Sequence, residues 1–151
     1  MTKEQEDKWF KEVLMNYPVF AEKYFKIKTK DGKILPFKLN NAQLKVDSIV
    51  NETIKQGKPQ RFIILKARQE GISTYFSGRG FWRNMTRKFW KTAVVGHVKD
   101  ASNNLFDMIK RFYNYLPESL QPELQASNEK KLGFSKLESE MKVFTAEGGD
   151  S

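Results

Sequence analysis

The sequence predicts an α/β fold with a mainly parallel sheet, because short apolar segments alternate with longer amphipathic ones. Three segments are predicted to be strands: 61–65 (RFIIL), 91–98 (KTAVVGHV) and 142–151 (KVFTAEGGDS), which runs into a glycine-containing loop. Helical patterns separate them at 73–87 and 100–116. A β-α-β-α-β order is typical of a parallel sheet, because parallel strands need a crossover connection.

Two helices are expected to pack on this sheet. The first contains Gly78 and Gly80, each of which costs about 1 kcal/mol relative to Ala, so we expect close packing of helix on sheet there. Asp100 can cap the second helix and Pro117 ends it; its apolar residues recur every three or four positions, at Ala101, Leu105, Met108, Ile109, Phe112 and Leu116. Residues 117–136 are polar and are expected to form loop or short helix.

The chain is expected to begin with a helical segment, 1–25, before the main domain portion, 26–151. A helix at 3–16 is interrupted by Pro18, which can start a second helix. Alternating residues around Asp31-Gly32 predict a β-hairpin. A helix capped by Asn40 and ended by Gly57 follows, with an inward stripe of Val46, Ile49, Val50, Thr53 and Ile54.

Composition excludes several classes of protein. The chain has no cysteine and one histidine, His97, so neither a disulfide framework nor a zinc site is expected. It has neither a signal peptide nor the roughly 20-residue apolar run that crosses a bilayer, so we expect a cytoplasmic protein. The net charge of +9 indicates an anionic partner, either nucleic acid or nucleotide phosphate. Basic residues cluster at Arg79, Arg83, Arg87, Lys88 and Lys91, and at Lys110 and Arg111.

The segment between the 61–65 strand and the 73–87 helix carries the main functional signal. A phosphate loop needs backbone N–H groups at a helix N-terminus, a cation for the β- and γ-phosphates, and a hydroxyl for Mg²⁺. In the usual pattern G-x-x-x-x-G-K-[ST], Gly71 takes the second glycine position and Ser73 the hydroxyl position. Ile72 replaces the usual lysine, while Lys66 stands at the first glycine position, from where it could fold back over the phosphates. An ordinary strand-to-helix turn with surface charges is the alternative.

The run K-A-R-Q-x-G-x-S-T resembles the deviant Walker A motif of phage terminase large subunits, some of which carry the lysine at the loop's start. The resemblance extends to TKDGKILPFKLNNAQ, FSGRGFWRNMTR, VVGHVKDASNNLFDMIKRFYNYLP and TAEGGDS, and covers roughly residues 20–151. It implies a P-loop NTPase fold of the additional-strand type, here incomplete.

The resemblance also implies roles for individual residues. Lys66 would contact phosphate, and Arg68 would stabilise the γ-phosphate like a cis arginine finger, which makes these two the catalytic residues. Ser73 would ligate Mg²⁺ with support from Thr74, and Gln43 would read the adenine edge. The nucleotide-binding set is then Gln43, Lys66, Ala67, Arg68, Gln69, Glu70, Gly71, Ile72, Ser73 and Thr74.

Other readings compete with some of these roles. Gln43 also has capping-box spacing from Asn40. His97, at a strand end, could meet DNA or phosphate, but we favour an ordinary strand-end group. Glu147 and Asp150 are not assigned as the Walker B carboxylates, because no apolar strand ending in Asp-Glu precedes them. An aromatic group could stack on DNA, although we favour core packing for its members, Trp82, Phe89 and Trp90.

The implied function is ATP hydrolysis, with Mg²⁺, that packages double-stranded DNA into procapsids. The implied partners are DNA, the portal protein, the small terminase subunit and further copies in a ring on the portal, in the host cytoplasm and without a membrane. We expect the chain to be the front part of a longer protein, cut before its Walker B carboxylates and nuclease domain, and to bind nucleotide weakly with little or no hydrolysis. The alternatives are a helicase-like DNA-stimulated ATPase and a stand-alone, non-catalytic nucleotide- or DNA-binding regulator.

Overall fold

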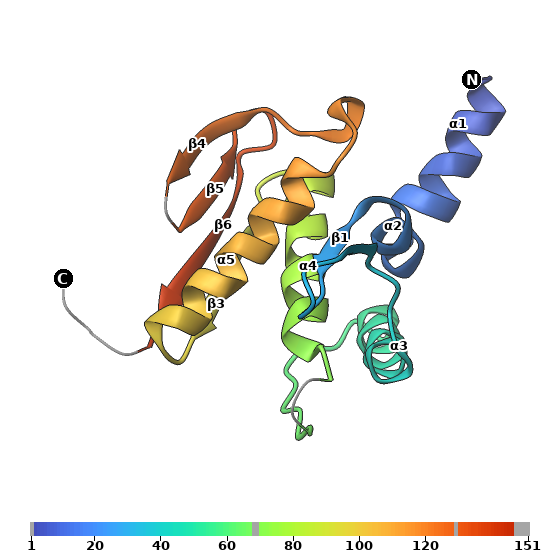
Figure 1. The fold of residues 1–151 in the computed structure, drawn as a ribbon. Helices are drawn as coiled ribbons and strands as arrows, with labels where there is room; N and C mark the ends of the chain where they lie inside the picture. Colours follow the sequence, from blue (N-terminus) through green and yellow to red (C-terminus); the bar gives the residue numbers. More distant parts are fainter. Residues whose placement is uncertain (1, 68–69, 129, 147–151) are drawn as a thin grey trace.

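The structure is a computed structural model that describes residues 2–67, 70–128 and 130–146. Three short helices open the chain (Figure 1): α1 (Lys3–Trp9), the π-helical η1 (Phe10–Leu14) and α2 (Tyr17–Tyr24). Pro18 lies in the first turn of α2, where its missing N–H costs nothing. The predicted break of the N-terminal helix before this proline is therefore confirmed.

The hairpin and the helix after it are also confirmed. Strands β1 (Lys26–Lys28) and β2 (Ile34–Pro36) pair antiparallel. Helix α3 (Asn41–Lys55) has Asn40 as its N-cap, and Gly57 follows it with a left-handed φ of +65°. Its buried face differs from the predicted stripe, however.

On α3, Val50 is buried, but Ile49 is half exposed and lies outside the core. The buried positions beside Val50 are polar instead, namely Gln43 and Asp47. The apolar pattern could not identify them, because their burial depends on partners in another helix.

Four strands form one mixed sheet in the order β3-β6-β5-β4. The strands are β3 (Lys91–Gly96), β4 (Leu124–Asn128), β5 (Lys131–Phe134) and β6 (Ser139–Thr145). β3 and β6 are parallel, while β6–β5 and β5–β4 are antiparallel, so the prediction of a mainly parallel sheet is wrong.

The error comes from residues 117–136, which we expected to be loop or short helix. They contain a 3-10 turn (η2, Glu118–Leu120) and then the whole of β4 and β5. These strands are short and mix polar with apolar residues, so they lack the apolar run that predicts a buried strand.

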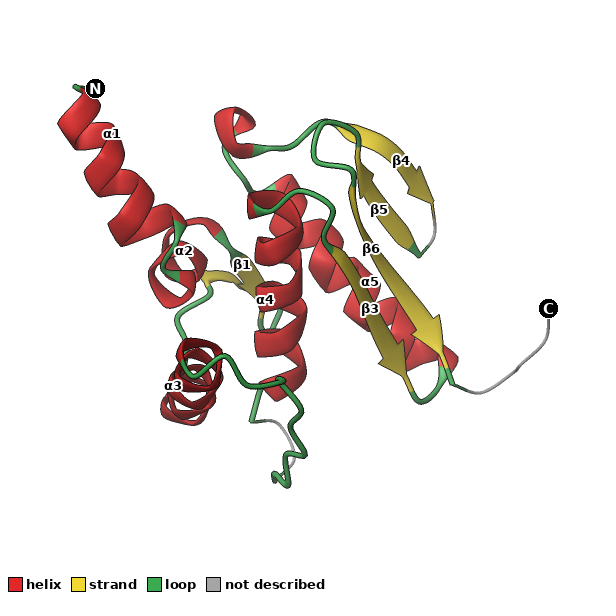
Figure 2. Ribbon diagram, turned by 180° about the vertical axis from the view of Figure 1, so that it is seen from behind, coloured by secondary structure: helices red, strands yellow, loops and turns green. Residues whose placement is uncertain are grey.

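Two helices cover one face of the sheet (Figures 1 and 2): α4 (Ile72–Thr86) precedes β3, and α5 (Lys99–Asn114) follows it. The core includes Met141 and Val143 from this face, with Val94 packed against it, whereas side chains such as Val95 and Phe144 on the other face are exposed. No described helix is both long and apolar enough to cross a membrane.

The start of α5 differs slightly from the prediction. Val98 is its N-cap, without a side-chain cap, and Asp100 lies in its first turn. A carboxylate there still interacts favourably with the positive end of the helix.

An aromatic core joins α2, the hairpin, α4 and α5. Phe25 stacks on Phe112 with ring centroids 4.6 Å apart. A Cβ at Gly78 would lie 2.6 Å from the Tyr17 hydroxyl, in this core, whereas one at Gly80 would lie 2.8 Å from Thr92 Cγ2 in β3. Close packing of helix on sheet is therefore confirmed for Gly80 and wrong for Gly78, which packs on the aromatic core.

The predicted strand at 61–65 is absent, because residues 58–67 form neither helix nor strand. The Ile63 and Leu65 side chains are fully exposed. β3 was expected to be buried, yet its residues are mostly exposed or half-buried, and β6 is its one neighbour among the described strands. Backbone N–H and C=O groups need a partner strand to form a ladder, and no described strand pairs with 61–65 or with the outer edge of β3.

Candidate functional site

Helix α4 begins at the predicted phosphate loop, and its N-terminus has the features of an anion site. The N-cap is Gly71, at a left-handed φ of +68°, which favours glycine. Within the described residues, no side chain caps the helix and the first turn carries no acidic residue. Uncapped N–H groups at the positive end of a helix dipole attract an anion.

Two side-chain amides from the start of α3 hold the backbone of this loop. Asn40 Nδ2 donates to the carbonyl of Glu70 at 3.2 Å, and Gln43 Nε2 donates to the carbonyl of Gly71 at 2.7 Å. Both contacts join residues about thirty positions apart in the chain. The entry to α4 is therefore fixed by α3 and not by its own sequence alone.

Gln43 is buried, and both ends of its amide are engaged. Its Oε1 accepts from the Asn40 backbone N–H at 2.9 Å, so the capping box that competed with the adenine role is present. The adenine contact of Gln43 stays a prediction, and it requires this buried amide to become accessible to the base.

Gly71 has no room for a side chain. A Cβ on this residue would lie 2.6 Å from Gln43 Nε2 and 3.9 Å from Asn40 Nδ2. The left-handed backbone and the close approach of the Gln43 side chain both require glycine here.

The remaining loop residues differ in their exposure. Lys66 is exposed, and its ammonium donates to the Ala67 carbonyl at 3.4 Å. Arg68 and Gln69 lie outside the described residues. Ile72 is buried, so the residue at the usual lysine position packs inward.

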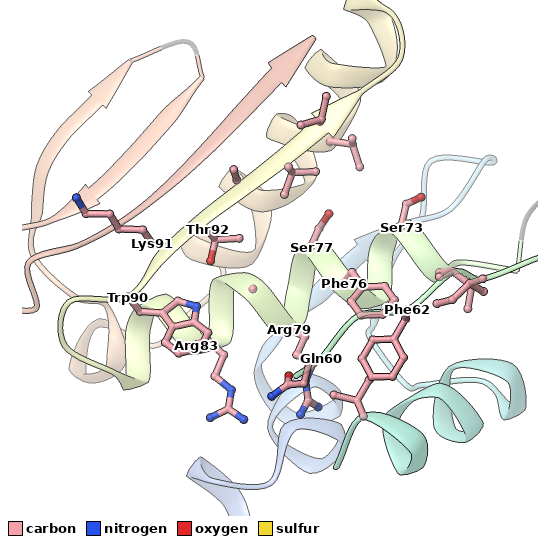
Figure 3. A pocket seen from close by; sticks show the side chains of 18 of the residues that line it. Gln60, Phe62, Ser73, Phe76, Ser77, Arg79, Arg83, Trp90, Lys91 and Thr92 are labelled. Atoms are coloured by element: carbon pink, nitrogen blue, oxygen red, sulfur yellow. The ribbon is translucent and has the colours of Figure 1, made fainter. Parts of the chain in front are cut away.

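Ser73 and Thr74 face different cavities. Ser73 is exposed and lines a cavity of about 880 Å³ between α3, α4, β3 and residues 60–64 (Figure 3). Thr74 lines a smaller cavity of about 490 Å³ beside β1 and α5. The structure thus brings Gln43 to the loop backbone, while no described hydrogen bond joins Lys66 to Ser73.

A buried polar network, which the sequence analysis missed, joins α3 to α4. Asp47 and Arg79 form a buried ion pair, and Asp47 also accepts from Tyr75 Oη and Asn51 Nδ2, each at 2.8 Å. Burial raises the pKa of Tyr75, which keeps its hydroxyl a donor. One signal was available, because Gln43, Asp47 and Asn51 recur every four residues on one face of the helix.

The aromatic group divides between core and surface. Trp82 is buried, and its Nε1 donates to the Leu14 carbonyl at 2.8 Å, so core packing is confirmed for it. Phe89 and Trp90 are exposed, so core packing is wrong for both. His97 follows β3 and is also exposed.

Ser73 is the described residue that fits the predicted magnesium role, because its hydroxyl is exposed beside the loop. Within residues 2–67, 70–128 and 130–146, no group of three His, Asp or Glu side chains could hold a metal ion. Glu147 and Asp150 lie outside the described residues.

Comparison with known proteins gives a likeness of fold. No protein-family model and no curated protein matches the chain. The fold is similar to the crystal structure of the HK97 bacteriophage large terminase, with a TM-score of 0.70 over 91% of this chain and 17% sequence identity. The match covers 28% of that terminase, so this chain spans less than a third of its length. The chain therefore has the fold of a part of a phage large terminase.

Proposed function

We propose that this chain is the ATP-binding part of a viral large terminase, which packages double-stranded DNA into procapsids by ATP hydrolysis. One observation supports this most directly: an uncapped helix N-terminus behind the left-handed Gly71, clamped by two amides, within a terminase fold. In that setting the partners are DNA, the portal protein, the small terminase subunit and further copies in a ring.

The phosphates would bind at the start of α4. Its first N–H groups point along the helix axis toward the loop and would receive phosphate oxygens. Lys66 and Arg68 would neutralise the β- and γ-phosphates, and Arg68 would act on the transition state as an arginine finger in cis. The exposed Lys66 side chain forms no salt bridge with a described carboxylate, and it would exchange its 3.4 Å contact with the Ala67 carbonyl for the phosphates.

Magnesium, when bound with ATP, would neutralise charge on the β- and γ-phosphates. Ser73 would hold it, with Thr74 in the same helical turn as support. Among the described residues, no group of three His, Asp or Glu side chains could hold this ion without the nucleotide. We therefore expect weak nucleotide binding and little or no hydrolysis by this chain alone.

Titration of the chain with a fluorescent ATP analogue and Mg²⁺ tests the proposal. We expect saturable binding that Lys66→Ala reduces by about tenfold, because a charge-assisted phosphate contact is lost. Lys58→Ala is the matched control: it removes an exposed lysine eight positions earlier, outside the loop, and should leave binding unchanged. Absence of binding, or equal losses in the two variants, would contradict the nucleotide site. Steady ATP turnover that depends on Lys66 would contradict the expected inactivity.

A further inference from the structure

The turn between α4 and β3 gathers cations and aromatic rings at the opposite end of α4 from the loop. We call Arg83, Arg87, Lys88, Phe89, Trp90 and Lys91 the arginine–tryptophan corner. The Arg83 guanidinium lies 4.7 Å from the Trp82 ring centroid and 5.9 Å from that of Trp90. Figure 3 shows the Arg83 side chain passing beside the Trp90 ring, with its guanidinium extending away from β3.

The cations in this corner form no salt bridge with the described residues. Arg79, one turn before Arg83, is paired with the buried Asp47. Arg83, Arg87 and Lys91 form no salt bridge with any described carboxylate, and neither does Lys88. Burial, and then the charges of Arg87 and Arg79, lower the pKa of Arg83 to about 10. A half-buried guanidinium among like charges is stabilised by a bound anion.

The corner is held in place by hydrogen bonds. Asn84, which is fully buried, donates to the carbonyls of Trp90 and Glu140, both at 2.7 Å. The Phe89 N–H donates to the Leu137 carbonyl at 2.8 Å. The positions of the two exposed rings therefore follow from the fold of the sheet and not from a free loop.

Phe89 itself is unusual. Its φ of +59° lies in the left-handed region, which costs a bulky residue free energy, and the residue is 68% exposed. Neither the strain nor the exposure contributes to the described core. An outward aromatic ring beside a tryptophan and several cations is suited to a planar, anionic partner.

We propose that the arginine–tryptophan corner binds nucleic acid. Arg83 and Arg87 contact backbone phosphates, with Lys88 and Lys91 at the edge, and the Phe89 and Trp90 rings stack on unpaired bases. The rings favour nucleic acid over an acidic protein segment, because acidic side chains offer no flat face to stack. The inference rests on the proposed function only in taking DNA as the nucleic acid.

The test is fluorescence anisotropy of a labelled single-stranded oligonucleotide and of its duplex, at two salt concentrations. Arg83→Gln with Arg87→Gln should weaken binding by at least about tenfold and reduce the salt slope by about 2, since two phosphate contacts are lost. Lys30→Gln with Lys58→Gln is the control, because it removes the same charge from exposed sites elsewhere and should change affinity less than about twofold. Equal losses in both pairs would overturn the proposal.

Two further variants keep the test valid if Arg83→Gln destabilises the fold. Arg87 and Lys88 are exposed, so Arg87→Gln with Lys88→Gln should fold normally and still weaken binding. Trp90→Leu should weaken binding of single strands more than of duplex, and equal losses would overturn the stacking role. Nucleotide binding, measured on the same variants, should not change, which separates a failure of this site from a failure of the ATP site.

Discussion

Substitution of Gly71 by alanine tests how the loop is clamped. The added Cβ would lie 2.6 Å from Gln43 Nε2, and the left-handed φ of +68° is unfavourable for alanine. Holding alanine in the left-handed backbone conformation contributes about 1–2 kcal/mol of destabilisation. Displacement of Gln43 breaks its part-buried hydrogen bond to the Gly71 carbonyl, which adds about 1–3 kcal/mol.

Gly57 provides a matched control. Its φ is +65°, almost the same, but no atom lies within 4 Å of an added Cβ. Gly57→Ala should therefore cost only the backbone contribution. Urea denaturation followed by circular dichroism should place Gly71→Ala about 1–3 kcal/mol below Gly57→Ala in free energy of unfolding, the share assigned to Gln43.

A double-mutant cycle identifies the cause. In a Gln43→Ala background the obstructing amide is gone, and the next atom from an added Cβ is Asn40 Nδ2 at 3.9 Å. Gly71→Ala should then cost no more than Gly57→Ala. If Gly71→Ala costs the same with and without Gln43, the clamp does not act as described.

Three other predictions concern the packing around α4. Asp47→Asn leaves Arg79 buried without a counter-charge and should lower the free energy of unfolding by about 3–5 kcal/mol. The control, Lys136→Ala, breaks an exposed pair with Glu123 and should lower it by less than about 1 kcal/mol. Urea denaturation measures both changes. Gly80→Ala should destabilise the fold by about 1–3 kcal/mol, because the added Cβ meets Thr92 Cγ2. Adding Thr92→Ser removes that methyl, keeps the hydroxyl bonded to Asn84 and should restore stability. If the double variant is no more stable than Gly80→Ala, this contact is not the cause. Burial raises the pKa values of Tyr17 and Tyr75, so both hydroxyls remain neutral in the folded state while the unfolded state ionises near the ordinary value of 10.0. The free energy of unfolding should therefore be constant with respect to these groups below that pH and fall above it, and an alkaline denaturation series in which Tyr17→Phe leaves the slope unchanged would be inconsistent with this.

The elements that the sequence predicted well are those set by neighbouring residues. Asn40 and Gly57 define both ends of α3, and Asp31-Gly32 defines the hairpin, because caps and tight turns are local. Strands depend on distant partners. Residues 61–65 have the sequence of a strand, but no described strand pairs with them. β4 does not have such a sequence, yet it forms a strand because it pairs with β5.

The candidate site divides in the same way. The position of Gly71 at the start of a helix was predicted, because the loop pattern is contiguous. The carbonyl contacts of Asn40 and Gln43 and the Asp47–Arg79 pair were not, because each joins residues about thirty positions apart. The available clue was the recurrence of Gln43, Asp47 and Asn51 every four residues on one face of the helix, since a buried carboxylate requires a partner.

Helix α4 links the two proposed sites, with the loop at its N-terminus and the arginine–tryptophan corner at its C-terminus. Its 15 residues separate them by roughly 22 Å. Three contacts fix the helix along this length: Gly71 to Gln43, Arg79 to Asp47, and Gly80 against Thr92. Coupling between two sites requires a connecting element that can adopt two arrangements, and these three contacts hold α4 in a single arrangement. Saturating nucleotide should therefore change the DNA affinity of this chain by less than about twofold; a tenfold change, equivalent to about 1.4 kcal/mol of coupling, would mean that at least one of the three contacts breaks when nucleotide binds.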